Sequence, residues 1–561
     1  MSQSNVMKLE RVLDEWSGVL GTGFCLTDSK KLAAAGRSAS HEPIEPIAIL
    51  QPKTVAEVQQ VVRIATRHGC PLHPVSGGKN IGYGAACPPG HGMALLDLSR
   101  MDRVVEVNSE LCYAVIEPGV TQGALSDLLQ QQAPTLMMDS TGAPRSASVI
   151  GSVLERGHGH TPYGERVLNL IAYDVVLADG RLLSTGFGHY PSAKCRHLYP
   201  WGLGPVLHPL FTQSNYGVVV RATVWLLPRP QYSTLYTFSF PNDETAAAAV
   251  PVLRQLRLRG IINTPLHLLN DLRFLTMSRR FPFATAKQST HLDQDELERL
   301  RQQHRLAAWS AVGAVHGSRR EVRFRIGEIR RALRGYATVR TISLNLVRIF
   351  RHSPKLFEML SGRPHATIEA LMRLVRGEPS DTPLQALYWR KRTEGVSETG
   401  DPLQDNCGIM WCSPVIPSSE EDFLTLVGIT RATCERHLTD ANVSLNFTAE
   451  RAACAIVGLF FDKADPQEFA RMKQCQSELY RAYAANGYYP YRAGHRIAAV
   501  APELFHEEDS YWQVCRELKQ MFDPQGIISP GRYGITLPSS NLALESEVVA
   551  ARGSVQFSHR K

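Results

Sequence analysis

No apolar run in the sequence is long enough to cross a bilayer, which takes about 20 consecutive apolar residues. We therefore expect no membrane anchor, and the polar N-terminus, which continues as an amphipathic helix pattern, predicts no signal peptide. No C-x-x-C pair occurs among the eleven cysteines, whose number is odd and whose positions are scattered. Free thiols in a reducing cytoplasm fit this distribution best.

Charge of either sign is modest, since 20% of the residues are charged and the net charge is +8 over 561 residues. The most basic segment is Ser318 to Gly335, where apolar residues recur at helical spacing and leave the arginines on the opposite face. No aromatic residue is expected on that face to stack on bases, so a solvated helix is favoured over a nucleic-acid site. We expect no nucleic-acid partner.

The length favours two domains, because 561 residues are many for one hydrophobic core. Strand and helix patterns alternate up to about residue 230, where the prolines of WLLPRP suggest a domain edge. Within this part, Thr54 and Glu57 predict the start of a helix that Gly69 ends. Hairpins are predicted across Asn108 to Glu110 and across Asp179-Gly180. From residue 231 a mixed α+β texture follows.

The stretch PVSGGKNIGYGAACP, Pro74 to Pro88, contains four glycines after an apolar run. Successive main-chain N–H groups in such a turn can bind the oxygens of a phosphate or pyrophosphate. The spacing matches neither G-x-G-x-x-G nor G-x-x-x-x-G-K-[ST], and taken alone a structural loop is the more common explanation. One large side chain, Tyr83, stands between two glycines, which favours a presented side chain over a core tyrosine.

Further glycine clusters occur in Ser148 to Leu170 and Trp201 to Pro228. With them the sequence resembles the flavoproteins typified by vanillyl-alcohol oxidase and para-cresol methylhydroxylase. The resemblance covers most of the chain, and its motifs are specific as a set although each is weak alone. In the family's order they are PVSGGKNIGYGAACP, VIEPGVT, ERGHGHTPYGE, VVLADGRLLSTGFG, FTQSNYGVV, WLLPRP, YYPYR and ISPGRYGI.

The resemblance implies an α+β flavoprotein of two domains. Residues 1–230 would form the first part of an FAD-binding domain that residues 490–540 complete. Residues 231–489 would form the cap, or substrate, domain, and residues 541–561 a disordered tail. The isoalloxazine ring would lie in a pocket between the domains. The family also implies a homodimer formed through the cap domain.

The first glycine stretch then corresponds to the family's FAD pyrophosphate loop. Lys79 stands where an arginine is usual, which keeps the charge but loses bidentate geometry. The FAD contacts that the resemblance implies are Ser76, Gly77, Gly78, Lys79, Asn80, Gly82, Tyr83, Pro118, Gly151, Ser152, Glu155, Gly157, Gly159, His160, Gly217, Val218 and Arg532.

The reaction that the family suggests is removal of a hydride from the benzylic carbon of a para-substituted phenol or a related aromatic alcohol. A phenolate loses this hydride more easily than a phenol, because it becomes a quinone methide. Fixed donors and positive charge at the phenolic oxygen lower its pKa and the barrier. The resemblance assigns these roles to Tyr83, Tyr491 and Arg492, and it places Arg532 near the flavin, where its charge would stabilise the reduced ring.

Each assignment has a plainer alternative. Adjacent residues on a strand face opposite ways, so the neighbours Tyr491 and Arg492 are weak evidence by themselves and could be a surface pair. Arg532 could be an ordinary turn residue.

The sequence departs from the family at the acidic residue that stands near flavin N5 in its oxidases. Ala143 aligns with that position, and Asp139 reaches it only with a gap, so the catalytic base is open. His158 and His160 form a GHGH motif, but a metal site needs a third ligand that the sequence does not supply, and no metal is predicted. A place for His160 near the flavin or the substrate mouth is a minor hypothesis.

FAD is predicted to be bound without a covalent link. The segments that carry a flavin-linking histidine or tyrosine in the family read RAACAIVGLFF and SETGDPLQDNCGI here, with neither residue. Cys454 is the one nucleophile nearby, and an apolar strand raises a thiol's pKa, so a buried structural cysteine is the better interpretation.

Three functions stay open. The enzyme could be an oxidase that returns electrons to dioxygen, and it could tailor a natural product. It could instead be a dehydrogenase or hydroxylase of a non-phenolic alcohol or hydroxy acid that passes electrons to a protein or quinone. The sequence has no C-x-x-C-H motif, so any haem would belong to a partner. A catalytically decayed flavin-binding protein is the third, suggested by the missing acidic residue and opposed by the retained tyrosines and arginines.

Overall fold

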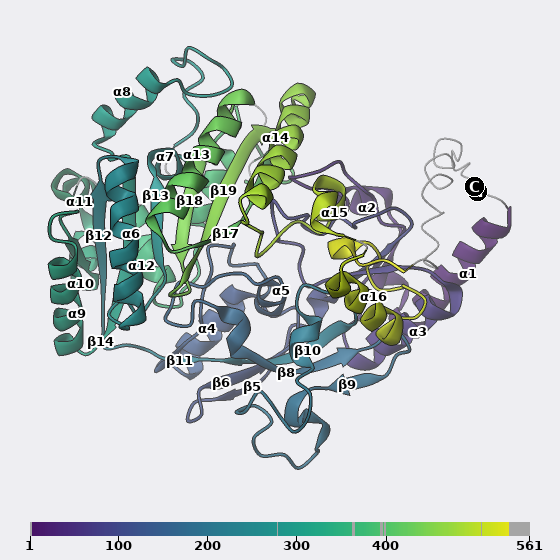
Figure 1. The fold of residues 1–561 in the computed structure, drawn as a ribbon. Helices are drawn as coiled ribbons and strands as arrows, with labels where there is room; N and C mark the ends of the chain where they lie inside the picture. Colours follow the sequence, from purple (N-terminus) through teal and green to yellow (C-terminus); the bar gives the residue numbers. More distant parts are fainter. Residues whose placement is uncertain are drawn as a thin grey trace.

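A computed structural model of the chain describes residues 3–537 except 278, 362–364, 393–395, 398–399 and 507 (Figure 1). Helices and strands are both abundant and are arranged around separate sheets, which confirms the α+β prediction. The tail predicted at residues 541–561 lies outside the described residues.

A four-stranded sheet with the order β1-β2-β4-β3 lies near the N-terminus. Helix α3 begins after Thr54, whose side chain accepts a hydrogen bond from the Glu57 N–H, and ends at Gly69 in the left-handed conformation, as predicted. In a capping box the Glu57 carboxylate would accept a hydrogen bond from the N–H of Thr54, but here it accepts from the N–H of Lys53. The elements are α1 (Gln3–Leu20), β1 (Cys25–Leu26), α2 (Ser29–Ala35), β2 (Ile49–Leu50), α3 (Val55–His68), β3 (Leu72–Val75) and β4 (Ala94–Asp97).

A five-stranded sheet with the order β5-β6-β10-β8-β9 follows, and all its pairings are antiparallel. Both predicted hairpins are present, as β5 with β6 and β8 with β9. The elements are β5 (Val104–Asn108), β6 (Tyr113–Ile116), α4 (Gln122–Gln132), β7 (Leu136–Met137), α5 (Val149–Leu154), β8 (Leu170–Val176), β9 (Leu182–Ser184), β10 (Val218–Trp225) and β11 (Leu227–Pro228), which pairs with β7.

The third large sheet is antiparallel and has the order β15-β12-β14-β13-β18-β19-β16, with β17 beside β19. Figure 1 shows it as a layer apart from the two sheets of the N-terminal half. Its strands are β12 (Tyr232–Phe240), β13 (Leu266–Asn270), β14 (Trp309–Gly317), β15 (Arg340–Ser343), β16 (Cys407–Cys412), β17 (Val415–Pro417), β18 (Asn442–Phe447) and β19 (Ala452–Asp462).

The two faces of this sheet have different neighbours because side chains alternate along each strand. On β13, Leu266 and Leu268 enter the core beneath one group of helices, whereas His267 and Leu269 line a cavity on the other face. The first group comprises α6 (Asp243–Leu258), α9 (Arg319–Ala332), α13 (Glu420–Arg436) and α14 (Pro466–Ala485). Helices at the other face are α7 (Asp271–Thr276), α8 (Gln294–His304), α10 (Leu344–Ile349), α11 (Pro354–Ser361) and α12 (His365–Leu374).

The C-terminal segment returns to the first two sheets, carrying α15 (Ile497–Val500) and α16 (Ser510–Phe522) (Figure 1). The N–H of Leu72 donates to the carbonyl of Ile527 at 2.8 Å, and the N–H of Ser529 donates to the carbonyl of Leu72 at 2.7 Å. Such pairing between the C-terminal segment and β3 is what we expect if residues 490–540 complete the first domain. The domain boundaries themselves stay a prediction.

The basic helix α9 departs from its prediction in one detail. Phe324 is 60% exposed among the arginines, so the expectation of no aromatic residue on that face was wrong. It lies two residues after Val322 and therefore off the apolar stripe of the helix. No described helix has the length and apolarity of a membrane span. All eleven cysteines are free thiols.

Candidate active site

A cavity of about 470 Å³ lies between the loops of the N-terminal half and the third sheet. The first half contributes the glycine stretch after β3, the residues around α5 and the loop before β10, and the C-terminal segment contributes residues near 491 and 530. Residues 231–489, here called the cap side, contribute through β13, β16, β18, α7, α12 and the short helix η7 (Thr382–Tyr388).

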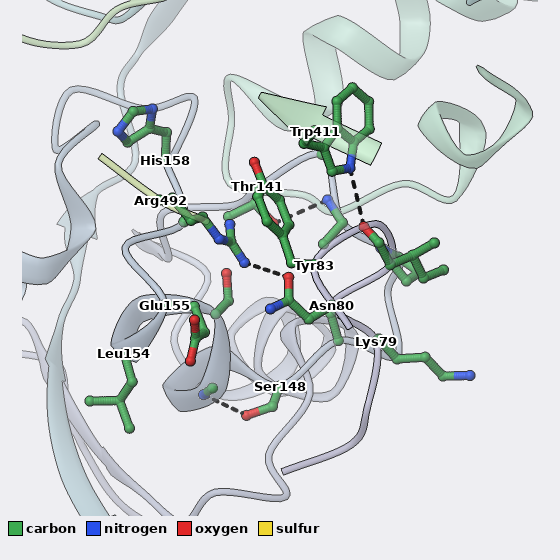
Figure 2. Close-up of a pocket in the computed structure, with 18 of the residues that line it drawn as sticks. Lys79, Asn80, Tyr83, Thr141, Ser148, Leu154, Glu155, His158, Trp411 and Arg492 are labelled. Carbon is green, nitrogen blue, oxygen red and sulfur yellow. Dashed lines mark hydrogen bonds between the residues drawn. The ribbon is translucent and has the colours of Figure 1, made fainter. Parts of the chain in front are cut away.

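The loop that carries Tyr83 depends on the glycine at each side of it. Gly82 and Gly84 have φ of +85° and +127°, which strain other residues. A Cβ on Gly82 would lie 2.4 Å from the indole nitrogen of Trp411, and one on Gly84 would lie 1.9 Å from the ring of His495. Because the backbone on both sides of Tyr83 is packed this closely, the Tyr83 side chain, which is only 7% exposed, is the part of this segment that reaches the cavity wall (Figure 2).

Arg492 lies against Tyr83 and is fixed by the glycine stretch. Its guanidinium carbon is 4.3 Å from the centre of the Tyr83 ring, and its Nη2 donates to Asn80 Oδ1 at 2.6 Å (Figure 2). The Tyr83 hydroxyl shares a 2.9 Å hydrogen bond with Ser413 Oγ, a residue of the cap side. A cation and a hydroxyl therefore meet at one part of the wall.

The Tyr491 side chain is oriented by a ring stack with His158 and not by a β-strand. Residues 491 and 492 form a bend after the isolated bridge between Pro490 and Pro414, so the rule that strand neighbours face opposite ways does not apply. The Tyr491 ring stacks on His158 at 4.3 Å and 10°. Burial raises the pKa of Tyr491, and it also raises that of Tyr83, so both hydroxyls stay protonated and can donate to an anionic oxygen.

The glycine stretch offers free donors for a phosphate. The main-chain N–H groups of Gly77, Gly78 and Lys79 donate to no other described residue. They follow β3 and line the cavity, which fits the pyrophosphate role that the sequence suggested. Fifteen of the proposed FAD contacts line the cavity, namely Ser76, Gly77, Gly78, Lys79, Asn80, Tyr83, Gly151, Ser152, Glu155, Gly157, Gly159, His160, Gly217, Val218 and Arg532.

Two of the proposed FAD contacts lie outside the wall. Gly82 is not part of the lining, and its missing side chain lets the loop pack against Trp411. Pro118 is buried, and its carbonyl accepts a hydrogen bond of 2.6 Å from Oγ of Ser148, the residue that caps α5.

Arg532 lines the cavity and pairs with Glu155. The second oxygen of the Glu155 carboxylate accepts a hydrogen bond from the Tyr533 hydroxyl. Within the described part of the chain, Glu155 is the one carboxylate of the cavity wall, and it is already neutralised by this pair.

Ala143 and Asp139, the two residues considered for the family's acidic position, have different surroundings. Ala143 lines the cavity, whereas Asp139 lies behind the GHGH loop and outside the lining. Asp139 Oδ1 accepts hydrogen bonds from the N–H groups of His160 (3.1 Å) and Thr161 (3.0 Å), and burial raises its pKa to about 6. Asp139 therefore holds the loop in place and does not supply the missing carboxylate.

The two histidines of this loop have separate surroundings. Burial lowers the pKa of His158 and of His160 to about 3, so both rings are neutral. His160 stacks on His267 at 4.9 Å, and His267 Nδ1 lies 2.8 Å from Asn446 Oδ1. No group of three potential metal-ligating side chains occurs among the residues that the structure describes.

Cys454 lies on β19 and outside the cavity lining. Burial raises the pKa of its thiol to about 12, and its Sγ is 3.9 Å from His158 Nε2. These surroundings are those of an unreactive structural cysteine.

Three residues of the site were not found from the sequence. Trp411 and Ser413 stand in NCGIMWCSPV, an apolar segment whose pattern predicts a strand and indicates no site; Ser413, which ends the apolar run, is the one signal there. Arg273 lies on the one-and-a-half-turn helix α7, and nothing in its neighbours distinguishes it from a surface arginine.

Comparison with known proteins gives consistent results. Residues 46–186 match the model of an FAD binding domain family. The chain is 34% identical over 536 residues to the 1'-carboxy-chondrochloren decarboxylase of Chondromyces crocatus, covering 94% of this chain and 98% of that protein. It is 25% identical over 540 residues to the 4-cresol dehydrogenase [hydroxylating] flavoprotein subunit of Pseudomonas putida, covering 94% and 96%.

Solved structures share the whole fold. The 4-ethylphenol oxidase of Gulosibacter chungangensis superposes with a TM-score of 0.85 at 27% identity, covering 95% of this chain and 98% of the other. The p-cresol methylhydroxylase with substrate bound also gives 0.85, at 24% identity and with 96% and 98% covered, which establishes a likeness of fold.

Proposed function

The chain belongs to the vanillyl-alcohol oxidase and para-cresol methylhydroxylase family of FAD-dependent oxidoreductases, and we propose that it removes a hydride from the benzylic carbon of a para-substituted phenol or related aromatic alcohol. The observation that carries the proposal is the meeting of Tyr83, Tyr491 and Arg492 at the wall of the cavity that also receives the glycine stretch. The names of the 4-cresol and 4-ethylphenol relatives support a phenolic substrate.

In this proposal each residue has a physical task. FAD, when bound on the glycine stretch, supplies the hydride acceptor. The protonated hydroxyls of Tyr83 and Tyr491 donate to the phenolate oxygen, and the Arg492 charge favours the ionised form of the substrate. Asn80 fixes the orientation of Arg492, and the stack on His158 fixes Tyr491.

Anaerobic reduction of the flavin by a panel of para-alkylphenols, aryl alcohols and hydroxy acids tests the proposal. We expect bleaching by the phenols. Bleaching by hydroxy acids alone would favour the non-phenolic alternative, and no bleaching by any member would favour a decayed flavin-binding protein.

The electron acceptor is either dioxygen or an external protein or quinone. Relatives of both kinds exist, since one is named a dehydrogenase subunit and another an oxidase. Mixing the reduced enzyme with air in a stopped-flow instrument separates the two, because an oxidase regains its yellow flavin rapidly. The relative named for a 1'-carboxy compound supports a carboxylated substrate, and natural-product tailoring is part of the proposal.

FAD is expected to be released when the protein is precipitated with acid. Cys454 is buried outside the cavity lining, and its raised pKa leaves little thiolate to attack the flavin. Absorbance of the supernatant at the flavin maximum measures the release. Yellow colour retained in the washed pellet of the parent protein, and lost in Cys454→Ala, would overturn the prediction.

We also propose that the chain forms a homodimer through residues 231–489 and that it works in a reducing cytoplasm. The eleven free thiols support the compartment. Light scattering at micromolar concentration is expected to give twice the mass of the chain, and the mass of one chain would contradict it.

A further inference from the structure

Arg273 places an unpartnered charge in the cavity. It lies on α7, directly after β13, and lines the cavity from the cap side. Its Nε and Nη1 are buried and have no hydrogen-bond partner among the residues that the structure describes. A guanidinium is charged at all physiological pH values, and leaving such a group buried without a partner is costly.

The other arginines of the cavity wall differ from Arg273. Arg492 donates to Asn80, and Arg532 pairs with Glu155. The acidic residue at the start of α7, Asp271, is already paired with Arg301 of α8. Arg273 makes no ion pair within the described part of the chain, so the protein itself supplies no counter-charge.

The neighbours of Arg273 hold it where a ligand can meet it. Its guanidinium carbon is 5.2 Å from the centre of the Trp411 ring. The indole N–H of Trp411, whose ring is labelled in Figure 2, donates to the carbonyl of Ile81 at 3.2 Å. Burial lowers the pKa of Arg273 to about 10, against the opposing effect of the nearby Tyr83. The side chain is therefore still charged at neutral pH, and it faces the same space as Tyr83.

We propose that Arg273 binds a carboxylate of the substrate, so that the substrate is a para-substituted phenol whose side chain carries a carboxylate. The inference rests on the proposed function and adds the second anchoring point. Planar guanidinium and carboxylate groups form short, charge-assisted hydrogen bonds. One cation beside the apolar side chains Leu269 and Met277 matches a monoanion better than the double charge of a phosphate.

The test compares an acid with its neutral isostere. Binding and anaerobic flavin reduction are measured with 3-(4-hydroxyphenyl)propanoate and with its primary amide, for the parent holoenzyme, Arg273→Gln and Arg279→Gln. Arg279 is an exposed arginine just beyond the same helix and serves as the matched loss of charge. We expect the parent to prefer the acid by about tenfold or more in affinity, a preference lost in Arg273→Gln and kept in Arg279→Gln.

Each outcome decides a separate point. Equal affinity of the parent for acid and amide would overturn the carboxylate role while leaving phenol oxidation intact. Tight binding of the acid without reduction by either compound would contradict the proposed function and retain the anchor, because binding is read separately from the perturbed flavin spectrum. An unchanged preference in Arg273→Gln, with a shifted spectrum of the free holoenzyme, would show that Arg273 contacts the flavin instead. If Arg273→Gln does not fold, Arg273→Lys should keep the charge, lose the planar fork and show a reduced preference.

Discussion

Arg492→Ala is expected to slow flavin reduction by a para-alkylphenol by about a hundredfold or more. The change removes the cation that lies 4.3 Å from the Tyr83 ring, and with it the charge that holds the substrate as a phenolate. Tyr83→Phe and Tyr491→Phe each remove one donor and should have smaller effects. The limiting rate of anaerobic reduction in a stopped-flow instrument is the measurement.

The pH profile separates a role in catalysis from a role in folding. Without Arg492 the substrate has lost the group that lowers its pKa, so the reduction rate should rise with pH as the phenol ionises at its ordinary pKa. Arg492→Lys keeps the charge but loses the planar fork toward Asn80 and should lie between the parent and the alanine variant. Parent rates in all three variants, Arg492→Ala, Tyr83→Phe and Tyr491→Phe, would show that the phenolate does not bind there.

Local signals predicted the local elements well. Thr54 and Gly69 bound a helix because a side-chain cap and a left-handed glycine act within one turn. Asp179-Gly180 marked a hairpin for the same reason, since the turn is decided by two residues. The glycine stretch likewise kept its donors free at the end of a strand.

Contacts between distant residues were beyond the sequence. Tyr83 and Ser413 are 330 positions apart, and only the packing of the third sheet over the glycine stretch brings their hydroxyls to 2.9 Å. Asp139 is close to Ala143 in sequence, but the turn between them puts one behind the loop and the other in the cavity. Arg273 has no local signature, because a buried arginine on a short helix resembles an exposed one until its surroundings are known.

Gly84→Ala is expected to disable the site through its backbone. The new Cβ would lie 1.9 Å from the ring of His495, which is itself packed between His41 and His73 at ring-centre distances of 5.4 Å. The φ of +127° adds strain that glycine avoids. Together these effects should lower the free energy of unfolding by roughly 2–6 kcal/mol, read from the midpoint of urea unfolding.

The same substitution should also slow flavin reduction, because relief of the clash moves the segment that carries Tyr83. The Tyr83 carbonyl accepts a hydrogen bond from the His495 N–H at 3.3 Å, so a displaced His495 shifts the tyrosine directly. Gly23→Ala is the matched control, since a Cβ there meets nothing within 4 Å and its φ is not positive. If Gly84→Ala unfolds and reduces like Gly23→Ala, the tight loop is not what positions Tyr83, and its place in the cavity must then depend on the Ser413 and Arg492 contacts alone.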